Sequence, residues 1–120
     1  MAKVKEIIPS EAEEQKAFCD WLDGQGIHYF ATAMGVWFSK PNPRYIQSLK
    51  QRGFKAGVPD LCILLDNGVT VFIEMKKRKG GVVSDAQKVW IKWLGEHGYP
   101  AEVCKGAVEA VRFIKAVRGK

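Results

Sequence analysis

Three ionisable side chains interrupt two apolar segments of the sequence, and their chemistry would suit phosphodiester hydrolysis. Asp60 begins the first segment, while Glu74 and Lys76 end the second. Two carboxylates held close together repel each other unless a cation lies between them, and Mg²⁺ commonly takes one or two carboxylates plus water and phosphate oxygens. Such an ion polarises a phosphoryl group, and a neighbouring lysine can orient the attacking water or stabilise developing charge. The alternative is a Glu–Lys surface pair at a strand end and an aspartate that caps a turn after Pro59.

Whether these side chains meet depends on the register of a predicted β-hairpin. Residues 60–65 and 69–76 are nearly continuous in apolar residues and flank Asp66-Asn67-Gly68. A two-residue loop would put Asp60 and Glu74 on opposite faces of the hairpin. A three-residue loop would put them directly opposite each other, with Lys76 on the same face. Asp-Asn-Gly favours the longer loop, because glycine readily takes the left-handed conformation that ends it. We therefore expect the three side chains to converge at the open end of the hairpin.

Helices and further strands must position this hairpin. Ser10 and Glu13 form a capping box that predicts the start of a first helix, and its inward side carries one or two carboxylates, Glu11 and Glu14. The other predicted elements are a strand over 27–38 that ends near Gly35, a short helix over 44–51, a helix that begins at Ser84 with Gln87 completing a second capping box, a strand over 99–104 and a helix over 107–117.

Composition limits the class of protein. The chain has 120 residues, of which 47% are hydrophobic and 27% charged, and we expect one globular domain over 1–120. It has no apolar run of membrane-spanning length and no apolar segment typical of a signal peptide. Its three cysteines lack the Cys-x-x-Cys spacing of a thiolate zinc site, and their odd number argues against a disulfide framework. These features predict a cytoplasmic protein without a membrane partner.

The basic residues are segregated along the chain. The net charge is +6, and no acidic residue lies between Asp23 and Asp60. Segregation of this kind is typical of a protein that turns one face toward a polyanion, although a solvated basic surface is the alternative. Aromatic residues are interleaved with the basic ones, and Trp37 is a candidate for base stacking. The predicted nucleic-acid contacts are Lys40, Arg44, Lys50, Arg52, Lys55, Lys77, Arg78 and Lys79.

The motifs resemble those of a known group of nucleases. Gly57-Val58-Pro59-Asp60 followed by Glu74-Met75-Lys76 is similar to the PD-(D/E)XK signature of restriction-endonuclease-like nucleases. With Glu11-x-x-x-Gln15 and Ser84-Asp85-Ala86-Gln87, the chain resembles the stand-alone VRR-NUC domain proteins, small nucleases common in phages and prophages. The resemblance runs from about Ser10 to Ile114. It implies an α/β fold with a restriction-endonuclease-like core, a mixed central sheet flanked by helices, in the order α-β-β-β-α-β-α.

The resemblance also implies residue roles. Asp60 and Glu74 would bind Mg²⁺ or Mn²⁺ together with the backbone carbonyl of Met75, and Lys76 would be the catalytic lysine. Glu11 would be the first-helix carboxylate, catalytic and metal-binding, with Glu14 as its rival. Gln87 would support the site, or would be only a helix cap. The chain departs from the family at Ala31-Thr32-Ala33 and at Lys105, where the family often has site-facing polar or arginine residues, and these departures concern substrate contacts.

These residues and the resemblance together predict a divalent-metal-dependent DNA endonuclease without a small-molecule cofactor. The resemblance to dimeric junction resolvases implies a homodimer that prefers branched DNA, above all four-way (Holliday) junctions. The alternatives are a catalytically silent nucleic-acid-binding module, or a nuclease that acts on general duplex DNA or on RNA. Apolar residues that a small core does not need are candidates for the dimer interface: Trp37, Phe38, Tyr45, Phe113 and Val117.

Overall fold

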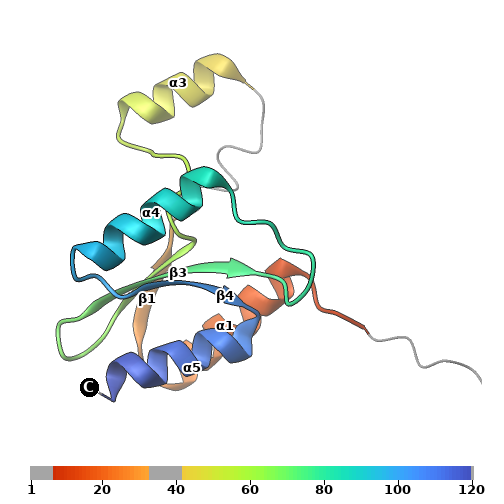
Figure 1. Ribbon diagram of the computed structural model, residues 1–120, viewed down its shortest axis with the longest axis vertical. Helices are drawn as coiled ribbons and strands as arrows, with labels where there is room; N and C mark the ends of the chain where they lie inside the picture. Colours follow the sequence, from red (N-terminus) through yellow and green to blue (C-terminus); the bar gives the residue numbers. More distant parts are fainter. Residues whose placement is uncertain (1–6, 33–41, 120) are drawn as a thin grey trace, which may run out of the picture.

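A four-stranded mixed sheet lies between two helices on one side and a single helix on the other (Figure 1). The computed structural model describes residues 7–32 and 42–119. Within these ranges no helix is long and apolar enough to cross a membrane. Along the chain the elements are α1 (Glu11–Gly24), β1 (His28–Ala31), α3 (Pro43–Gln51), β2 (Leu61–Leu64), β3 (Thr70–Lys76), α4 (Asp85–Glu96), β4 (Ala101–Lys105) and α5 (Ala107–Arg118).

The strands lie in the order β1-β2-β3-β4. The pairs β1–β2 and β2–β3 are antiparallel, whereas β3 and β4 are parallel. Parallel neighbours need a crossover connection, and α4 provides it. This is the mixed sheet flanked by helices that the family resemblance implied.

The hairpin of β2 and β3 has the predicted three-residue loop. Leu61 pairs with Ile73, and the N–H of Leu65 donates to the carbonyl of Val69 at 3.0 Å. Gly68, the last loop residue, has a φ of 83°, in the left-handed region that glycine adopts without strain. One step beyond Leu61 in this register, Asp60 lies opposite Glu74.

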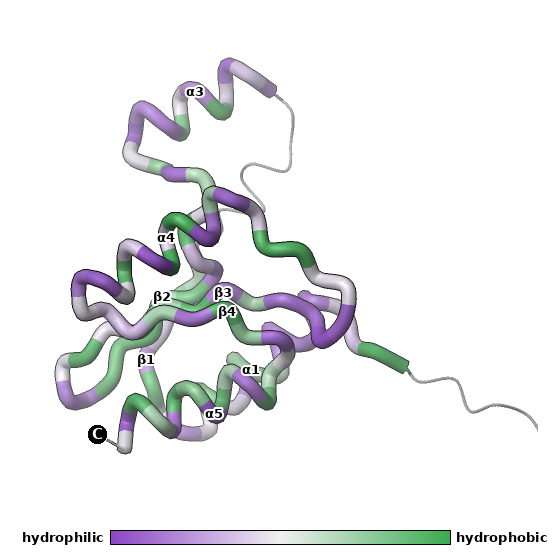
Figure 2. The backbone as a smooth tube through the Cα atoms, viewed as in Figure 1, coloured by the Kyte–Doolittle hydropathy of each residue, from purple (hydrophilic) through white to green (hydrophobic). Residues whose placement is uncertain are grey.

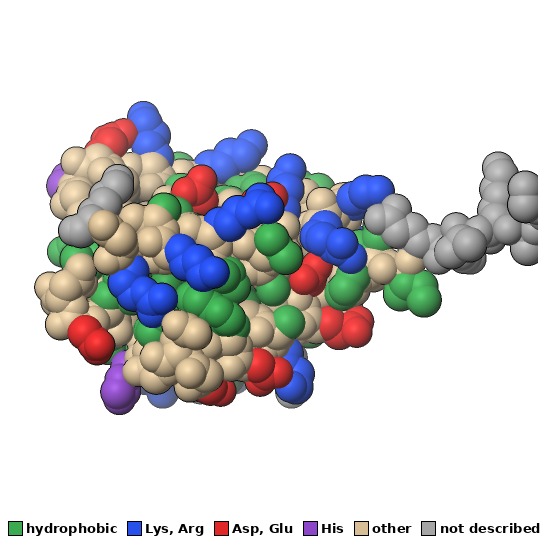
Figure 3. Space-filling view, turned by 90° about the horizontal axis from the view of Figure 1, so that it is seen from below, with side chains coloured by type: hydrophobic (Ala, Val, Ile, Leu, Met, Phe, Trp, Pro, Cys, Tyr) green, Lys and Arg blue, Asp and Glu red, His purple; other side chains and the backbone are tan. Residues whose placement is uncertain are grey.

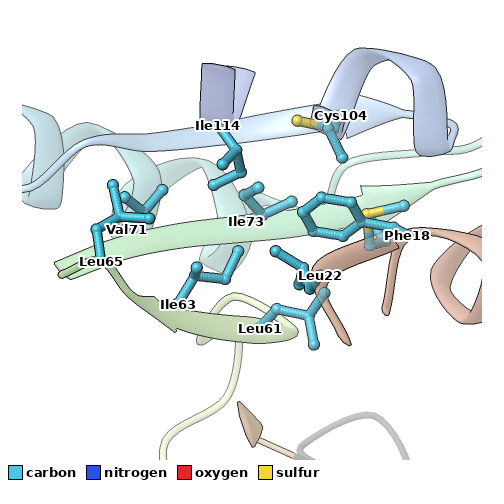
Figure 4. Packing of buried hydrophobic residues seen from close by; sticks show 11 residues of the cluster. Phe18, Leu22, Leu61, Ile63, Leu65, Val71, Ile73, Cys104 and Ile114 are labelled. Atoms are coloured by element: carbon cyan, nitrogen blue, oxygen red, sulfur yellow. The ribbon is translucent and has the colours of Figure 1, made fainter. Parts of the chain in front are cut away.

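The hydrophobic core lies on one face of the sheet. Residues at every second position of β2 and β3 point toward α1 and α5, where they pack with Phe18, Leu22 and Ile114 (Figure 4). Because side chains alternate between the two faces of a strand, the intervening residues of β3 point the other way. These residues include Glu74 and Lys76, and they share their side of the sheet with α4 (Figure 1).

Capping boxes begin the two helices for which the sequence predicted them. The Ser10 side chain accepts from the N–H of Glu13, and the Ser84 side chain accepts from the N–H of Gln87. The predicted strand over 27–38 is confirmed over His28–Ala31, which form β1. Thr32 lies just beyond this strand, and residues 33–38 lie outside the described residues. The late strand begins at Ala101, two residues after Tyr99, because Tyr99 is still bound to α4, where its N–H donates to the carbonyl of Leu94 at 2.9 Å.

The helix α3 lies beyond α4, away from the sheet (Figure 1). It is mostly hydrophilic, in contrast to the strands (Figure 2). The segment that leads from α3 to β2 is anchored on α4, where the indole N–H of Trp90 donates to the carbonyl of Ala56 at 3.1 Å. Gly57 has a φ of +83°, and a Cβ on it would lie 2.6 Å from Ala86. This close approach holds the base of the α3 segment next to the helix that carries Gln87.

Candidate active site

Asp60 is held at the start of β2 by contacts on both sides. Its backbone carbonyl accepts from the N–H of Thr32 at 2.8 Å, and the Thr32 hydroxyl donates to the carbonyl of Pro59 at 2.9 Å. The backbone N–H of Met75 donates to Oδ2 of Asp60 at 2.8 Å. This last bond draws the carboxylate of Asp60 across to β3, beside Glu74.

Glu74 and Lys76 are charged residues buried beside each other on β3. Their relative exposure is 2% and 9%, and Nζ of Lys76 lies 3.7 Å from Oε2 of Glu74. The side-chain amide of Gln87 also donates to Oε2 of Glu74, at 3.0 Å. The other oxygen, Oε1, is buried and has no hydrogen-bond partner. A buried carboxylate oxygen without a donor is costly, so this atom is available to a cation.

The surroundings of Glu74 oppose its ionisation. Burial is the main cause that raises its pKa, to about 8, and the neighbouring charge of Asp60 adds to the rise. Lys76 acts in the opposite direction, while the charge of Glu11 raises the pKa further. These surroundings favour the protonated form of Glu74 in the metal-free protein. A divalent cation would have to displace that proton, as metal binding to carboxylates generally does.

Gln87 both caps α4 and contacts the site, the two functions between which the sequence left a choice. Its Oε1 accepts from the backbone N–H of Ser84 at 2.8 Å, which completes the capping box of α4. Its Nε2 donates to Glu74. The start of α4 is thereby tied to the carboxylate on β3.

The two glutamates of α1 take different positions. Glu14 is buried, with an exposure of 7%, and it contacts Arg78 and the first residue of α5. Glu11 is exposed, and its charge acts on Glu74. The expectation that carboxylates lie on the inward side of this helix is thus confirmed for Glu14. Glu11 is the glutamate of this helix whose charge acts on Glu74.

The donor set fits a hard divalent cation with incomplete protein coordination. Among residues 7–32 and 42–119, no group of three or more His, Cys, Asp or Glu side chains is close enough to hold a metal ion. Asp60 and Glu74 form a pair, and the remaining ligands would be carbonyl, water or phosphate oxygens. Mg²⁺ is commonly bound in this way, through one or two carboxylates.

The predicted nucleic-acid contacts fall in two places. Arg44, Lys50, Arg52 and Lys55 are exposed on α3 and just after it, whereas Lys40 lies outside the described residues. Lys77, Arg78 and Lys79 form the turn after β3. Seen from the side of α1 and α5, basic, acidic and apolar side chains are interspersed rather than segregated (Figure 3).

A cavity beside the turn after β3 has no counterpart in the sequence prediction. It has a volume of about 620 Å³ and lies between the start of α1 and this turn. Ser10 and Glu11 line it from α1, and Lys77 and Lys79 line it from the turn. Its residues come from distant parts of the chain, so only the packing of α1 against the end of β3 reveals it.

The mixed sheet and its flanking helices form a restriction-endonuclease-like α/β fold. The model of the VRR-NUC domain family matches residues 10–108. The chain belongs to this family, which is one of nucleases, and its function is therefore of the nuclease type.

A solved structure supports the same assignment. This structure, described as a VRR_NUC domain protein, is 26% identical, and the similarity covers 91% of this chain and 88% of that one, with a TM-score of 0.66. No curated protein matches the chain.

Proposed function

We propose that this protein is an Mg²⁺- or Mn²⁺-dependent endonuclease that hydrolyses phosphodiester bonds in DNA. The observation that carries the proposal is the buried oxygen Oε1 of Glu74, which has no hydrogen-bond partner and lies in a site shared with Asp60 and Lys76. A divalent cation bound here would polarise the phosphoryl group and lower the pKa of a bound water.

Each residue of the site has a proposed role. The carboxylates of Asp60 and Glu74 and the backbone carbonyl of Met75 would hold the cation. Glu11 adds a negative charge from α1 that acts on Glu74, although among the described residues it forms no three-carboxylate group with the pair. The ammonium group of Lys76 orients the attacking water and stabilises the charge that develops on the phosphate. Gln87 keeps the carboxylate of Glu74 in one orientation through its hydrogen bond. The same bond ties the start of α4 to β3.

The proposed substrate is branched DNA, cut by a homodimer. One copy of a domain of this size offers one site, whereas cutting two opposed strands of a four-way junction needs two sites in fixed relation. A two-fold dimer has the symmetry that a junction itself has. Of the interface candidates, Tyr45 is 40% exposed, while Phe113 and Val117 pack partly against the core, and Trp37 and Phe38 lie outside the described residues.

A panel of labelled substrates tests the activity. We expect cleavage of a four-way junction in the presence of Mn²⁺ or Mg²⁺, and none with EDTA. Linear duplex, single-stranded DNA, a flap and RNA are the comparison substrates. Equal cutting of the junction and its matched linear duplex would leave a general endonuclease, and binding without cutting of any substrate would leave a nucleic-acid-binding module.

The exposed cations after the middle of α3 should control the salt dependence of DNA binding. Neutralising Lys50, Arg52 and Lys55 together should weaken binding and reduce the slope of log affinity against log salt by about 0.9 for each lost phosphate contact. The measurement is a titration of fluorescent junction DNA at several salt concentrations.

The matched control for this triple variant also removes three positive charges, but from other helices. Lys16, Lys92 and Lys115 are exposed on α1, α4 and α5, and neutralising them should leave the slope nearly unchanged. Equal slopes for the parent and the α3 variant would place the DNA on another face of the protein.

Light scattering should show twice the mass of one chain at micromolar concentration. We expect a dimer because coordinated cutting of two DNA strands needs two active sites in one protein assembly. A monomer across the micromolar range would contradict the dimer, and nicking of one strand per encounter would then be the expected product pattern.

A further inference from the structure

A second buried carboxylate, that of Glu14, belongs to α1, which packs on the core side of the sheet. Oε1 of Glu14 accepts from the N–H of Ala107 at 3.2 Å, and Oε2 lies 3.1 Å from Nε of Arg78. Ala107 begins α5, whose own N-cap, Gly106, has no side chain to offer a hydrogen bond. A carboxylate from α1 thus caps α5, in the position where the helix dipole favours a negative charge.

Gly106 is the point at which these contacts meet the end of β3. Its N–H donates to the backbone carbonyl of Lys76 at 2.9 Å. Its φ is +94°, and a Cβ on it would lie 2.7 Å from Cγ of Arg78 and 3.1 Å from Oε2 of Glu14. The stem of Arg78 and the carboxylate of Glu14 therefore close over the residue that holds the backbone of Lys76.

These contacts reach Lys76 through its backbone and not through its side chain. The Lys76 side chain points toward Glu74 and α4, whereas Glu14 belongs to α1, on the core side of the sheet. The turn that carries Arg78 lies next to the start of α1 (Figure 1). The backbone of Lys76 is thus held at the β4 side of β3, while its ammonium group lies beside Glu74.

We propose that Arg78, paired with Glu14, is a positioning residue that fixes the end of β3 and with it the ammonium group of Lys76. The inference rests on the proposed nuclease function, in which Lys76 acts at the phosphate. In this proposal Arg78 does not contact a phosphate of the substrate, although its side chain is 46% exposed and DNA could reach it. Displacement of a reacting group by about 1 Å can cost 10²-fold in rate, so loss of the pair should be visible in turnover.

The test compares Arg78→Ala and Arg78→Lys with the parent on the best-cleaved DNA. We expect kcat to fall by about 10- to 100-fold in Arg78→Ala, with KM, Mg²⁺ affinity and the salt slope of DNA binding nearly unchanged, and partial recovery in Arg78→Lys. If Arg78 instead contacts a phosphate, its loss lowers the salt slope by about 0.9 and leaves kcat unchanged. That result would overturn the proposal.

A second variant and a second measurement make the test independent of activity and of folding defects. Glu14→Gln keeps an acceptor for Ala107 but removes the charge that holds Arg78, and it should lower kcat in the same direction. In both variants the amide hydrogen of Gly106 should exchange faster, while the urea midpoint stays near that of the control Arg112→Ala, an exposed residue of α5.

The outcomes separate the two proposals. If the parent cleaves no substrate, the proposed function fails, and exchange at Gly106 still decides whether Arg78 and Glu14 hold the end of β3. Unchanged exchange at Gly106 in both variants would overturn the inference whatever the activity.

Discussion

Lys76→Ala should lose turnover by at least about 10²- to 10³-fold while still binding Mg²⁺. A preorganised donor aimed at developing charge is worth about this much when it is removed, and an ammonium group is not a metal ligand. Lys76 is 9% exposed and lies 3.7 Å from Oε2 of Glu74, so no solvent cation can easily replace it. Turnover is measured on the junction substrate, and Mg²⁺ binding by calorimetry.

The control for Lys76 is another lysine with a glutamate partner. Lys92 pairs with Glu96 on the surface of α4 at 3.4 Å, and its side chain is 81% exposed. Exposed pairs of this kind contribute little, so Lys92→Ala should cleave like the parent. Cleavage by Lys76→Ala within a few-fold of the parent would contradict the catalytic role of Lys76.

Asp60→Asn should lose both metal binding and turnover. The substitution removes one of the two carboxylate charges of the Asp60–Glu74 pair, but it keeps an oxygen that can accept from the N–H of Met75. The fold should therefore persist, as circular dichroism and a urea titration would show. Because a bound cation supplies several kcal/mol of transition-state stabilisation, we expect turnover to fall by at least about 10³-fold.

Calorimetry and a Mn²⁺-induced rise in melting temperature measure the loss of binding in Asp60→Asn. Glu102→Gln is the control, because Glu102 is an exposed carboxylate on the neighbouring strand β4, and it should bind metal like the parent. Undiminished Mg²⁺ binding by Asp60→Asn would remove Asp60 from the metal site.

The two variants separate the contributions of cation and lysine. Loss of both properties in Asp60→Asn, together with loss of turnover alone in Lys76→Ala, is the pattern expected of metal-assisted hydrolysis. Loss of metal binding in both would mean that Lys76 acts mainly on Glu74, whose pKa its charge lowers.

Much of the fold and the centre of the site follow from local sequence. Asp66-Asn67-Gly68 determines the loop length, the loop length determines the register of β2 and β3, and the register places Asp60 opposite Glu74. The capping boxes at Ser10 and Ser84 likewise involve residues three apart. The two partners of each of these interactions are only a few residues apart along the chain, so the local residue types specify them.

Tertiary packing decided the parts that local patterns left open. Helical spacing places Glu11 and Glu14 on the same side of α1, and only the docking of this helix against α5 and the turn after β3 buries Glu14 with Arg78. For the same reason the charge pattern alone could not distinguish Arg78 from its neighbours Lys77 and Lys79. Gln87 was expected either to cap α4 or to support the site. It does both, accepting from the N–H of Ser84 and donating to Glu74, because α4 packs across β3. Such contacts join residues that are distant in the chain. Their energies depend on burial, and these residues become buried only when the helices pack against the sheet.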